Sequence, residues 1–580
     1  MTKNTPPGLI VVIFLHFPIS KYTPFCKKRP VVLPLYLPKM MNCHLKPFFF
    51  VVAAWLLLLL FSCTSPSNKK EGAVFRYNQP GGITSLDPAF AKDQANIWAV
   101  NQLYNGLVQL NDSLQIMPCL AKSWNISPDG LTYTFTLRND VYFHDHELFN
   151  NGKGEKMTAF DVAYSLGRLL NEQVASPGAW LFNGKVDEQQ PFNALNDTVF
   201  QLRLQQPYRP LLNILSMQYC YVVPQKIAQH YGKEFRNHPV GTGPFRFKTW
   251  LENEALILAA NRNYFETDAQ NNPLPYIDGI KITFTENKRT AFLQFLNGNL
   301  DLISGIDATY KDEVLTPDGQ LLPALNGKVQ LLRSPQLITE YLGFLLGTGG
   351  NPALQNKKVR QAIGYGIDRP RLIRYLRNNI GAPATQGFIP KGMPAFSPQT
   401  PGFTFQPDKA RQLLKEAGFE GGKGLPTITL EMTPAYQDLC TAIQKQLSEL
   451  GFNIALEMNP PSLLREKTAK GEAAFFRASW IADYADAESY LAVMYGNNPA
   501  PPNYTRFNNP KYNQLYQAAL AQNNPEERYR IYRQLDQLIL EEVPVIPLFY
   551  DEVLRFTRPN IENLGINPLN LLNCKQVKIK

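Results

Sequence analysis

The chain has 580 residues, of which 44% are hydrophobic, and its 58 Lys and Arg against 48 Asp and Glu give a formal net charge of +10. The first 63 residues hold seven basic residues and no acidic one, so the remaining chain carries 51 basic against 48 acidic residues. A nearly neutral chain lacks the strongly basic surface that nucleic-acid-binding proteins present, and we expect no nucleic-acid partner.

An uncharged apolar block extends from Phe48 to Cys63. It is shorter than the roughly 20 residues of a spanning helix and has the size of a signal-peptide core. A small residue followed by Cys63 resembles a bacterial lipoprotein cleavage site, which implies lipidation of Cys63; a plain N-terminal membrane anchor is the alternative. Residues 1–39 are Pro-rich and suggest an over-extended start before Met40 or Met41, and residues 64–72 form a polar tether.

The part after the leader is long enough for two or three domains at about 100–200 residues each. It contains four further cysteines, Cys119, Cys220, Cys440 and Cys574, with no CxxC spacing. An exported protein could pair them in three ways, and unpaired core cysteines are an equal alternative. We find no internal repeat.

Alternating strand and helix patterns follow along the chain. Apolar residues three and four apart predict a helix over 95–110, and polar–apolar alternation predicts a strand over 132–137. Thr158 and Asp161 indicate a helix start with part of a capping box, and 239–244 is a turn before a new strand. Further helices are predicted at 359–365, 407–417, 439–450 and 528–541. This alternation favours α/β layers.

Enzyme motifs are missing from the sequence. It contains no GxSxG, HExxH or GxxxxGK[ST] pattern, and we expect neither an enzyme nor a cofactor. His144 and His146 would share one face of a strand and could form a metal pair, but a solvated loop is the preferred interpretation. We therefore assign no metal site. His230 and His238 are interpreted as ordinary surface histidines.

An ordered series of short segments resembles a known family. The segments are Pro118–Trp124, Ser127–Arg138, Val141–Asp145, Thr158–Ser165, Val240–Phe245, Val359–Ile363 and Ile367–Arg369. Together they resemble extracellular solute-binding protein family 5, the receptors of peptide-uptake ABC transporters, over residues 73–560.

The resemblance implies a bilobal α/β protein of the periplasmic-binding-protein type, with mixed sheets and a monomeric state. The first lobe would be discontinuous, comprising residues 73–115, 241–339 and 546–580. A small domain would be inserted at 116–240, and the second lobe would cover 340–545. Ligand would lie between the lobes and be enclosed by hinge closure.

Residues 477–486 resemble the ligand-facing stretch of that family. By resemblance, Asp483 would pair with a peptide α-amino group and Arg477 with its carboxylate, while Trp480 would form an apolar wall and Tyr484 completes the set. The alternatives are structural: a loop carboxylate at 483, a surface ion pair at 477 and a core residue at 480. Asp486 could cap the following helix.

These observations predict a lipid-anchored, periplasmic receptor on a bacterial membrane that captures short peptides and delivers them to an ABC transporter permease. The same fold could bind another solute, such as an oligosaccharide or a metal chelate. A secreted peptide hydrolase and an adhesive surface lipoprotein are the alternatives from other classes, but the sequence lacks a catalytic set and repeats.

Overall fold

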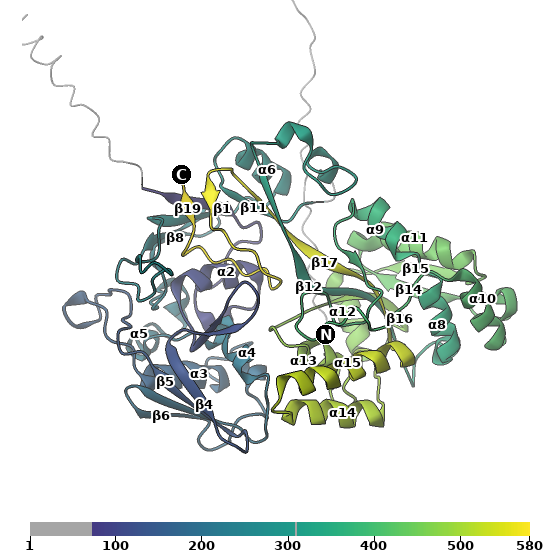
Figure 1. Cartoon of the computed structure of the whole chain (residues 1–580), viewed down its shortest axis with the longest axis horizontal. Coiled ribbons are helices and arrows are strands. Elements are labelled where there is room, and N and C mark those ends of the chain that lie inside the picture. Colours follow the sequence, from purple (N-terminus) through teal and green to yellow (C-terminus); the bar gives the residue numbers. More distant parts are fainter. Residues whose placement is uncertain (1–71, 308–309) are drawn as a thin grey trace, which may run out of the picture. The chain divides into compact units, whose positions relative to one another are not determined.

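The structure, a computed structural model, describes residues 72–307 and 310–580 (Figure 1). The predicted leader, the lipidation at Cys63 and all but the last residue of the tether lie outside these residues. Within the two described ranges, no helix is both long and apolar enough to cross a membrane.

One mixed sheet of eleven strands organises most of the described chain, in the order β15-β14-β16-β12-β17-β11-β1-β10-β9-β8 with β13 paired to β17. Strand β1 pairs in parallel with β10 and β11, whereas β12 and β17 are antiparallel. The strands are Val74–Asn78 (β1), Phe245–Leu251 (β8), Ala255–Ala260 (β9), Gly279–Thr283 (β10), Leu302–Ser304 (β11), Gln330–Phe344 (β12), Ala382–Pro383 (β13), Ile428–Met432 (β14), Ile454–Met458 (β15), Phe475–Ile481 (β16) and Val545–Thr557 (β17). The predicted α/β class with mixed sheets is confirmed.

A second, antiparallel sheet of four strands lies in the segment between β1 and β8. Its order is β4-β5-β7-β6, with bounds Ala121–Ile126 (β4), Thr132–Leu137 (β5), Phe192–Asn196 (β6) and Val199–Arg203 (β7). Strand β5 has the predicted bounds, and its alternate residues Tyr133, Phe135 and Leu137 are buried. Helix α3 (Ala159–Leu170) packs against β6 and β7. The Asp161 carboxylate accepts the Thr158 N–H and hydroxyl, each at 2.9 Å, as expected of a helix start fixed by these two residues.

The helix predicted over 95–110 is shorter in the structure. Helix α2 covers Gln94–Leu103, and the chain then becomes a hairpin of β2 (Val108–Leu110) and β3 (Ile116–Pro118). Tyr104 has an extended backbone, and its buried hydroxyl donates to the Leu86 carbonyl at 3.0 Å. A Cβ at Gly241 or Gly243 would meet the end of α2 at 2.6 Å or less, so the 239–244 turn packs directly on it. The apolar residues after Leu103 are thus buried by tertiary packing and not by a helix face, which is why the prediction was wrong there.

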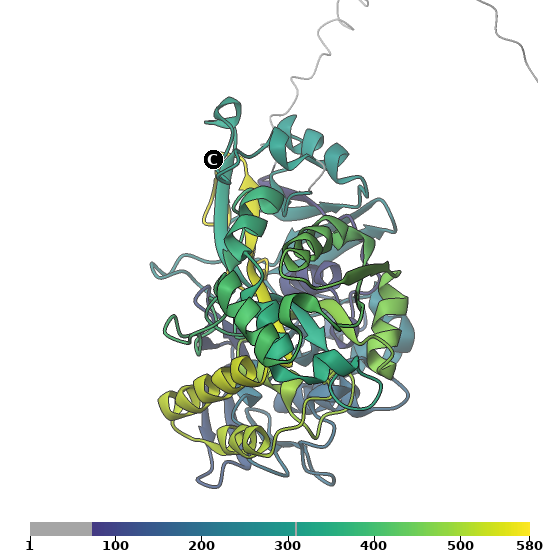
Figure 2. The same ribbon diagram turned by 90° about the vertical axis from the view of Figure 1, so that its right-hand side faces the viewer.

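Two sets of elements surround the main sheet, and each has its own apolar core. We call β1 to β11, with the four-stranded sheet, the first lobe; its core includes Trp98, Phe135 and Phe245. We call α7 to α15 the second lobe, whose two cores centre on Ile363 and Tyr490. Four of its helices, α8 (Lys357–Tyr365), α10 (Pro407–Glu416), α11 (Gln437–Ser448) and α15 (Pro525–Glu542), lie at the four predicted places. Its other helices include α7 (Pro352–Gln355), α9 (Arg369–Arg377), α12 (Pro461–Lys470), α13 (Glu488–Leu491) and α14 (Pro510–Ala521), and Figure 2 shows the α14–α15 pair in yellow-green.

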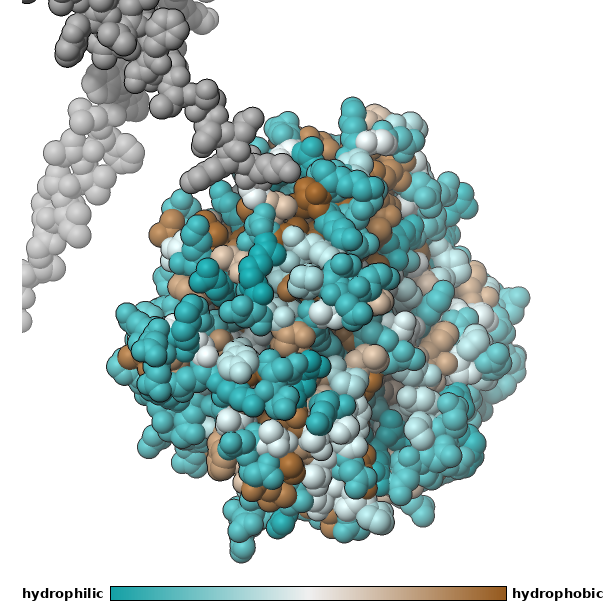
Figure 3. Space-filling model, turned by 60° about the vertical axis from the view of Figure 1, so that its left-hand side comes forward, coloured by the Kyte–Doolittle hydropathy of each residue, from teal (hydrophilic) through white to brown (hydrophobic). Residues whose placement is uncertain are grey.

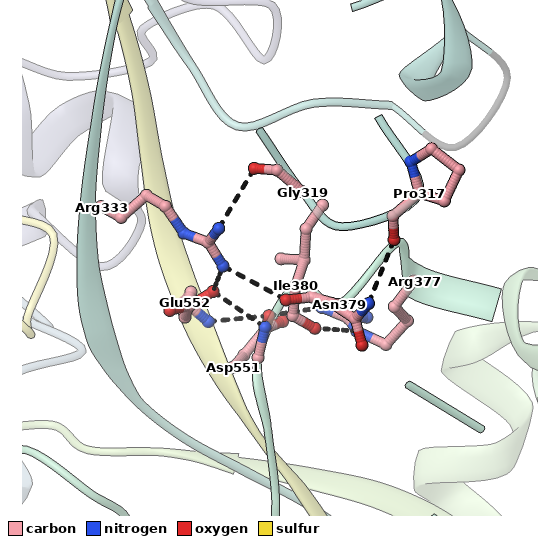
Figure 4. Close-up of polar contacts among 9 residues, drawn as sticks. Pro317, Gly319, Arg333, Arg377, Asn379, Ile380, Asp551 and Glu552 are labelled. Carbon is pink, nitrogen blue, oxygen red and sulfur yellow. Dashed lines mark hydrogen bonds and ion pairs between the residues drawn. The ribbon is translucent and has the colours of Figure 1, made fainter. Parts of the chain in front are cut away.

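The strands β12 and β17 belong to both lobes. Gln330–Pro335 pairs with Glu552–Thr557 beside β11, and Thr339–Gly343 pairs with Val545–Tyr550 beside β16, with a register shift between the two stretches. At this shift Arg333 pairs with Glu552 at 2.5 Å and donates to the Gly319 carbonyl at 3.1 Å (Figure 4). The lobes are therefore joined by two adjacent strands. The predicted domain boundaries after residues 339 and 545 fall within β12 and β17, and the domain division stays a prediction.

Candidate functional site

The predicted ligand-facing segment lies on β16 and in the loop that follows it. The Asp483 N–H donates to the Ser489 hydroxyl at 3.2 Å, and the Glu488 N–H donates to the Asp486 carboxylate at 3.0 Å. Asp486 also forms an ion pair with Arg528 at 3.1 Å. The Asp486 carboxylate therefore accepts the first N–H of the short helix α13 (Glu488–Leu491), but the N-cap of this helix is Ala487. Residues 483–489 form a loop closed by its own hydrogen bonds.

The Asp483 carboxylate has no hydrogen-bond or ion-pair partner within residues 72–307 and 310–580. The residue is exposed by its accessible surface, but its carboxyl is crowded by neighbouring atoms that displace water. This desolvation of the carboxyl, and then the negative charge of Glu488, raises the pKa of Asp483 to about 6. The site therefore holds an anionic group that is poorly compensated by the protein itself.

Tyr219 of the first lobe lies close enough to Asp483 to feel its charge. This tyrosine lies in a 3₁₀ turn (Gln218–Cys220) and is buried, and its pKa is raised to about 12 by burial and then by the charges of Asp483 and Asp93. Asp93 caps α2 by accepting the Asn96 N–H at 3.0 Å. Residues from both lobes thus converge within electrostatic reach of one another.

Tyr484 is part of a buried cluster of four residues, which we call the Glu488 cluster: Tyr208, Tyr484, Glu488 and Tyr516. The Tyr208 hydroxyl donates to Glu488 at 2.9 Å and lies 3.0 Å from the Tyr484 hydroxyl. The hydroxyls of Tyr484 and Tyr516 also donate to Glu488. Burial raises the pKa of Glu488, and the three hydroxyls oppose that shift by stabilising the carboxylate.

Arg477 already has a partner in the structure. It forms a buried ion pair with Glu340 of β12, and its guanidinium lies over the Tyr436 ring. Burial lowers the pKa of Arg477 to about 9. Arg477 is therefore not the surface ion pair of the alternative interpretation, and a ligand carboxylate would have to compete with Glu340.

Trp480 is half-buried against the second-lobe core, opposite Thr339 of β12. Its indole Nε1 is buried without a hydrogen-bond partner in the described part of the chain. Its predicted role as an apolar wall stays a prediction.

Sequence reasoning missed Tyr208, Tyr219 and Glu488. Glu488 follows Asp486 closely in sequence, but no sequence signal places either first-lobe tyrosine beside it.

The histidine prediction needs a correction. His144 is buried and not in a solvated loop: its ring contacts the Gly243 carbonyl at 2.9 Å and the Gly241 N–H at 3.3 Å. Residues 143–149 form no strand, so His146 does not share a face with His144 and lies against Tyr231 instead. Within the described ranges no three His, Cys, Asp or Glu side chains are placed to hold a metal ion. A groove of about 650 Å³ lies beside His144, and its lining does not include Asp483.

Comparisons with known proteins agree with this architecture. The family described as "Bacterial extracellular solute-binding proteins, family 5 Middle" matches residues 115–502. The glutathione-binding protein GsiB of Escherichia coli O1:K1 / APEC is 27% identical over 499 residues, covering 84% of this chain and 90% of that protein. HbpA2 from Haemophilus parasuis has a TM-score of 0.76 at 22% identity, covering 87% of this chain and 99% of that one. DppA from Helicobacter pylori, solved with the peptide STSA, has a TM-score of 0.70 at 24% identity, covering 88% and 99%.

The structural likenesses confirm the bilobal periplasmic-binding-protein fold. The family match covers more than half of the chain, and it assigns the molecule to proteins that bind solutes and are not enzymes. The chain belongs to family 5 of the bacterial extracellular solute-binding proteins.

Proposed function

We propose that this protein captures short peptides between its two lobes and delivers them to an ABC transporter permease. Asp483 would hold the free α-amino group of the peptide. The observation that carries the proposal is the Asp483 carboxylate, which has no partner of its own in the described residues and whose charge is felt at Tyr219 of the first lobe.

The physical argument concerns charge compensation. An ammonium group enclosed between two lobes loses its hydration and needs a counter-charge, because an unpaired buried charge is very costly. An ionised Asp483 is destabilised by crowding and by Glu488, so an ammonium ligand would relieve both effects. A neutral ligand such as an oligosaccharide could donate hydrogen bonds to Asp483 but would bring no positive charge to compensate it.

Relatives support a peptide ligand. Solved structures with the same fold include DppA with the peptide STSA and a dipeptide-binding protein with Met-Leu. The name of GsiB states that it binds glutathione. We also propose lipidation at Cys63, a periplasmic location at a bacterial membrane and a monomeric state, which rest on the sequence alone.

Binding measurements with paired peptides would test the proposal. We expect the purified protein to bind di- to penta-peptides, and Asp483→Asn to weaken free peptides at least about tenfold, as for a hydrogen-bonded charge. The N-acetylated form of each peptide should bind weakly to the unaltered protein and lose little further with the variant. Asp438→Asn is a suitable control, because Asp438 is an exposed carboxylate of the same lobe.

Equal losses for free and acetylated peptides would remove Asp483 from this role. A protein that binds oligosaccharides or metal chelates and none of the peptides would overturn the peptide ligand itself.

A further inference from the structure

The two lobes touch directly beside the candidate site, through the Glu488 cluster. Tyr208 belongs to the segment between β7 and helix α4 (Leu211–Leu215) of the first lobe, whereas Tyr484, Glu488 and Tyr516 belong to the second. All four are buried. Within residues 72–307 and 310–580, Tyr208 supplies the one hydroxyl from the first lobe that reaches the Glu488 carboxylate.

Further contacts surround this hydrogen bond. The rings of Trp180 and Tyr484 stack with centroids 6.5 Å apart, and Tyr484 packs into the first-lobe core. The Arg209 N–H donates to the Leu520 carbonyl of α14 at 3.2 Å. Figure 1 shows α4 in blue next to α13 and α14 in yellow-green at this junction. The second connection between the lobes is the pair of strands β12 and β17, and it involves none of these residues.

We propose that Tyr208 and Glu488 form a lock that holds the two lobes closed, and that the loop 483–489 couples this lock to ligand at Asp483. The coupling rests on the proposed function; the lock itself does not. Tyr208 acts as a positioning residue, because it holds the second-lobe loop in place without itself binding the ligand.

The coupling follows from the construction of the loop. Asp483 is tied to Ser489 by its own N–H, and Ser489 is the neighbour of Glu488. The Ser489 N–H donates in turn to the Asp486 carbonyl at 3.1 Å. A shift of the Asp483 backbone toward a ligand would therefore be passed through Ser489 to Glu488. A cation at Asp483 would also offset the repulsion between the two carboxylates, which favours an ionised Glu488 and strengthens its hydrogen bond to Tyr208.

Opening of the lobes would separate Tyr208 from Glu488 and leave the hydroxyls of Tyr484 and Tyr516 in place. This difference provides a matched pair of variants. Tyr208→Phe removes the hydroxyl that crosses between the lobes. Tyr516→Phe removes a hydroxyl from the same carboxylate within one lobe, so it controls for the loss of a hydrogen bond to Glu488.

The test is a distance measurement between the lobes. Gln189 and Lys511 are both exposed, and spin labels attached to Gln189→Cys and Lys511→Cys would report the distance between the lobes. Double electron–electron resonance would measure this distance in the protein without peptide. We expect the parent and Tyr516→Phe to share a population at short distance, and Tyr208→Phe to lose much of that population to longer distances. Identical distributions for all three proteins, or an equal shift with both variants, would overturn the lock.

Peptide affinity provides the second readout. For the peptide that the parent binds most tightly, we expect Tyr208→Phe to weaken binding by about tenfold, mainly through faster dissociation, and Tyr516→Phe to weaken it by less than threefold. An unchanged dissociation rate in Tyr208→Phe would refute the coupling. If the parent binds no peptide, the proposed function fails, while the distance measurement still decides whether the lock exists.

Discussion

At the scale of single residues, the acid–base behaviour of Asp483 makes binding dependent on pH. Its pKa is raised to about 6, above the usual value near 3.9, so the free site takes up a proton as the pH falls through 6. An ammonium ligand binds the ionised carboxylate. We therefore expect affinity for a free peptide to fall up to about tenfold for each pH unit below 6, and to decline again above about pH 8 as the peptide amine loses its proton.

Calorimetry between pH 5 and pH 9 would measure this profile, and Asp483→Asn provides the control because it should remove the acidic limb. A flat profile between pH 5 and pH 7 would contradict the assignment. The stability of the protein without ligand should change in the other direction. Because the pKa of Asp483 is higher in the folded than in the unfolded state, ionisation of Asp483 lowers the free energy of unfolding as the pH rises from about 4 to about 6.

Arg477 shows how a residue selected by sequence resemblance can have a structural role. Its guanidinium and the Glu340 carboxylate are both buried and paired. Removing one partner of a buried ion pair leaves an uncompensated charge, so Arg477→Met should lower the free energy of unfolding by about 3 kcal/mol. Urea denaturation would measure this loss, and the double variant with Glu340→Met should recover much of it.

The ligand carboxylate can be tested separately. Because Glu340 already neutralises Arg477, we expect amidation of a peptide C-terminus to change its affinity by less than about threefold, a small fraction of the energy of a charge-assisted hydrogen bond. A loss of more than tenfold, absent in Arg477→Met, would return Arg477 to the predicted role at the ligand carboxylate.

At the scale of secondary structure, local patterns predicted several of the helices and strands in the described chain. The strand at 132–137 and the helix that begins after Thr158 depend on alternation and capping within a few residues. The helix predicted to reach residue 110 fails because Tyr104 is buried through a contact with Leu86, a partner that local spacing cannot reveal. His144 fails for the same reason, since its partners lie about 100 residues later.

Two arginines, Arg360 and Arg369, explain why two of the segments that resemble the family, Val359–Ile363 and Ile367–Arg369, are needed for the fold. Arg360 donates to the carbonyls of Glu542 and Val543 at the end of α15, at 2.7 and 2.8 Å. Arg369 donates to the Pro547 carbonyl of β17 at 2.7 Å. Both guanidinium groups therefore satisfy backbone carbonyls where the second lobe meets the connecting strand. The sequence singled out these residues only through resemblance to the family, and it did not explain why a positively charged side chain is needed at either position.

The connecting strands should bend at the register shift between Pro335 and Thr339. Glu552 accepts from Arg333 and from the Gly381 N–H at 2.9 Å, and so links the turn at Gly319, which lies between β11 and β12, to the second lobe (Figure 4). Because the pair is partly exposed, we expect Glu552→Gln to cost only about 0.5–1 kcal/mol of stability.

The larger effect of Glu552→Gln should be local. We expect faster amide hydrogen exchange in residues 333–336 and 550–553, because the pair links both strands to the neighbouring turns. Asp551→Asn is the matched control: it removes the charge that pairs with Arg377, a pair that does not involve the turn at Gly319, and it keeps an oxygen that can accept the Glu552 N–H. Exchange that accelerates equally in both variants would argue against a special role for Glu552 at the shift.

At the scale of the whole molecule, the sequence predicted a ligand role for Asp483 but did not predict which first-lobe residues lie near it. Tyr208 and Tyr219 come from the inserted segment, and their approach depends on how two lobes close, which no local pattern encodes. The hydropathy of the surface does not help to locate the site. The face of the molecule shown in Figure 3 is mainly hydrophilic, with apolar side chains scattered over it. The site is therefore identified by its polar contacts.

The four cysteines report on whether the lobes unfold together. Cys119, Cys220, Cys440 and Cys574 are all free and buried, so the structure contains none of the pairings that the sequence left open. Burial raises the pKa of each thiol, to about 12 for Cys119, Cys440 and Cys574. Thiol labelling of the folded protein should therefore be very slow and should require opening of the structure.

Cys440 lies in a core of the second lobe, whereas Cys220 and Cys574 lie in the core of the first. Because β12 and β17 are shared by both lobes, loss of either lobe removes strand pairing from the other. We expect labelling at increasing urea, resolved for each cysteine by mass spectrometry, to give one common midpoint and to be unaffected by a reducing agent. A midpoint for Cys440 clearly below that of Cys220 and Cys574 would show that the second lobe unfolds on its own and that the shared strands do not couple the two cores.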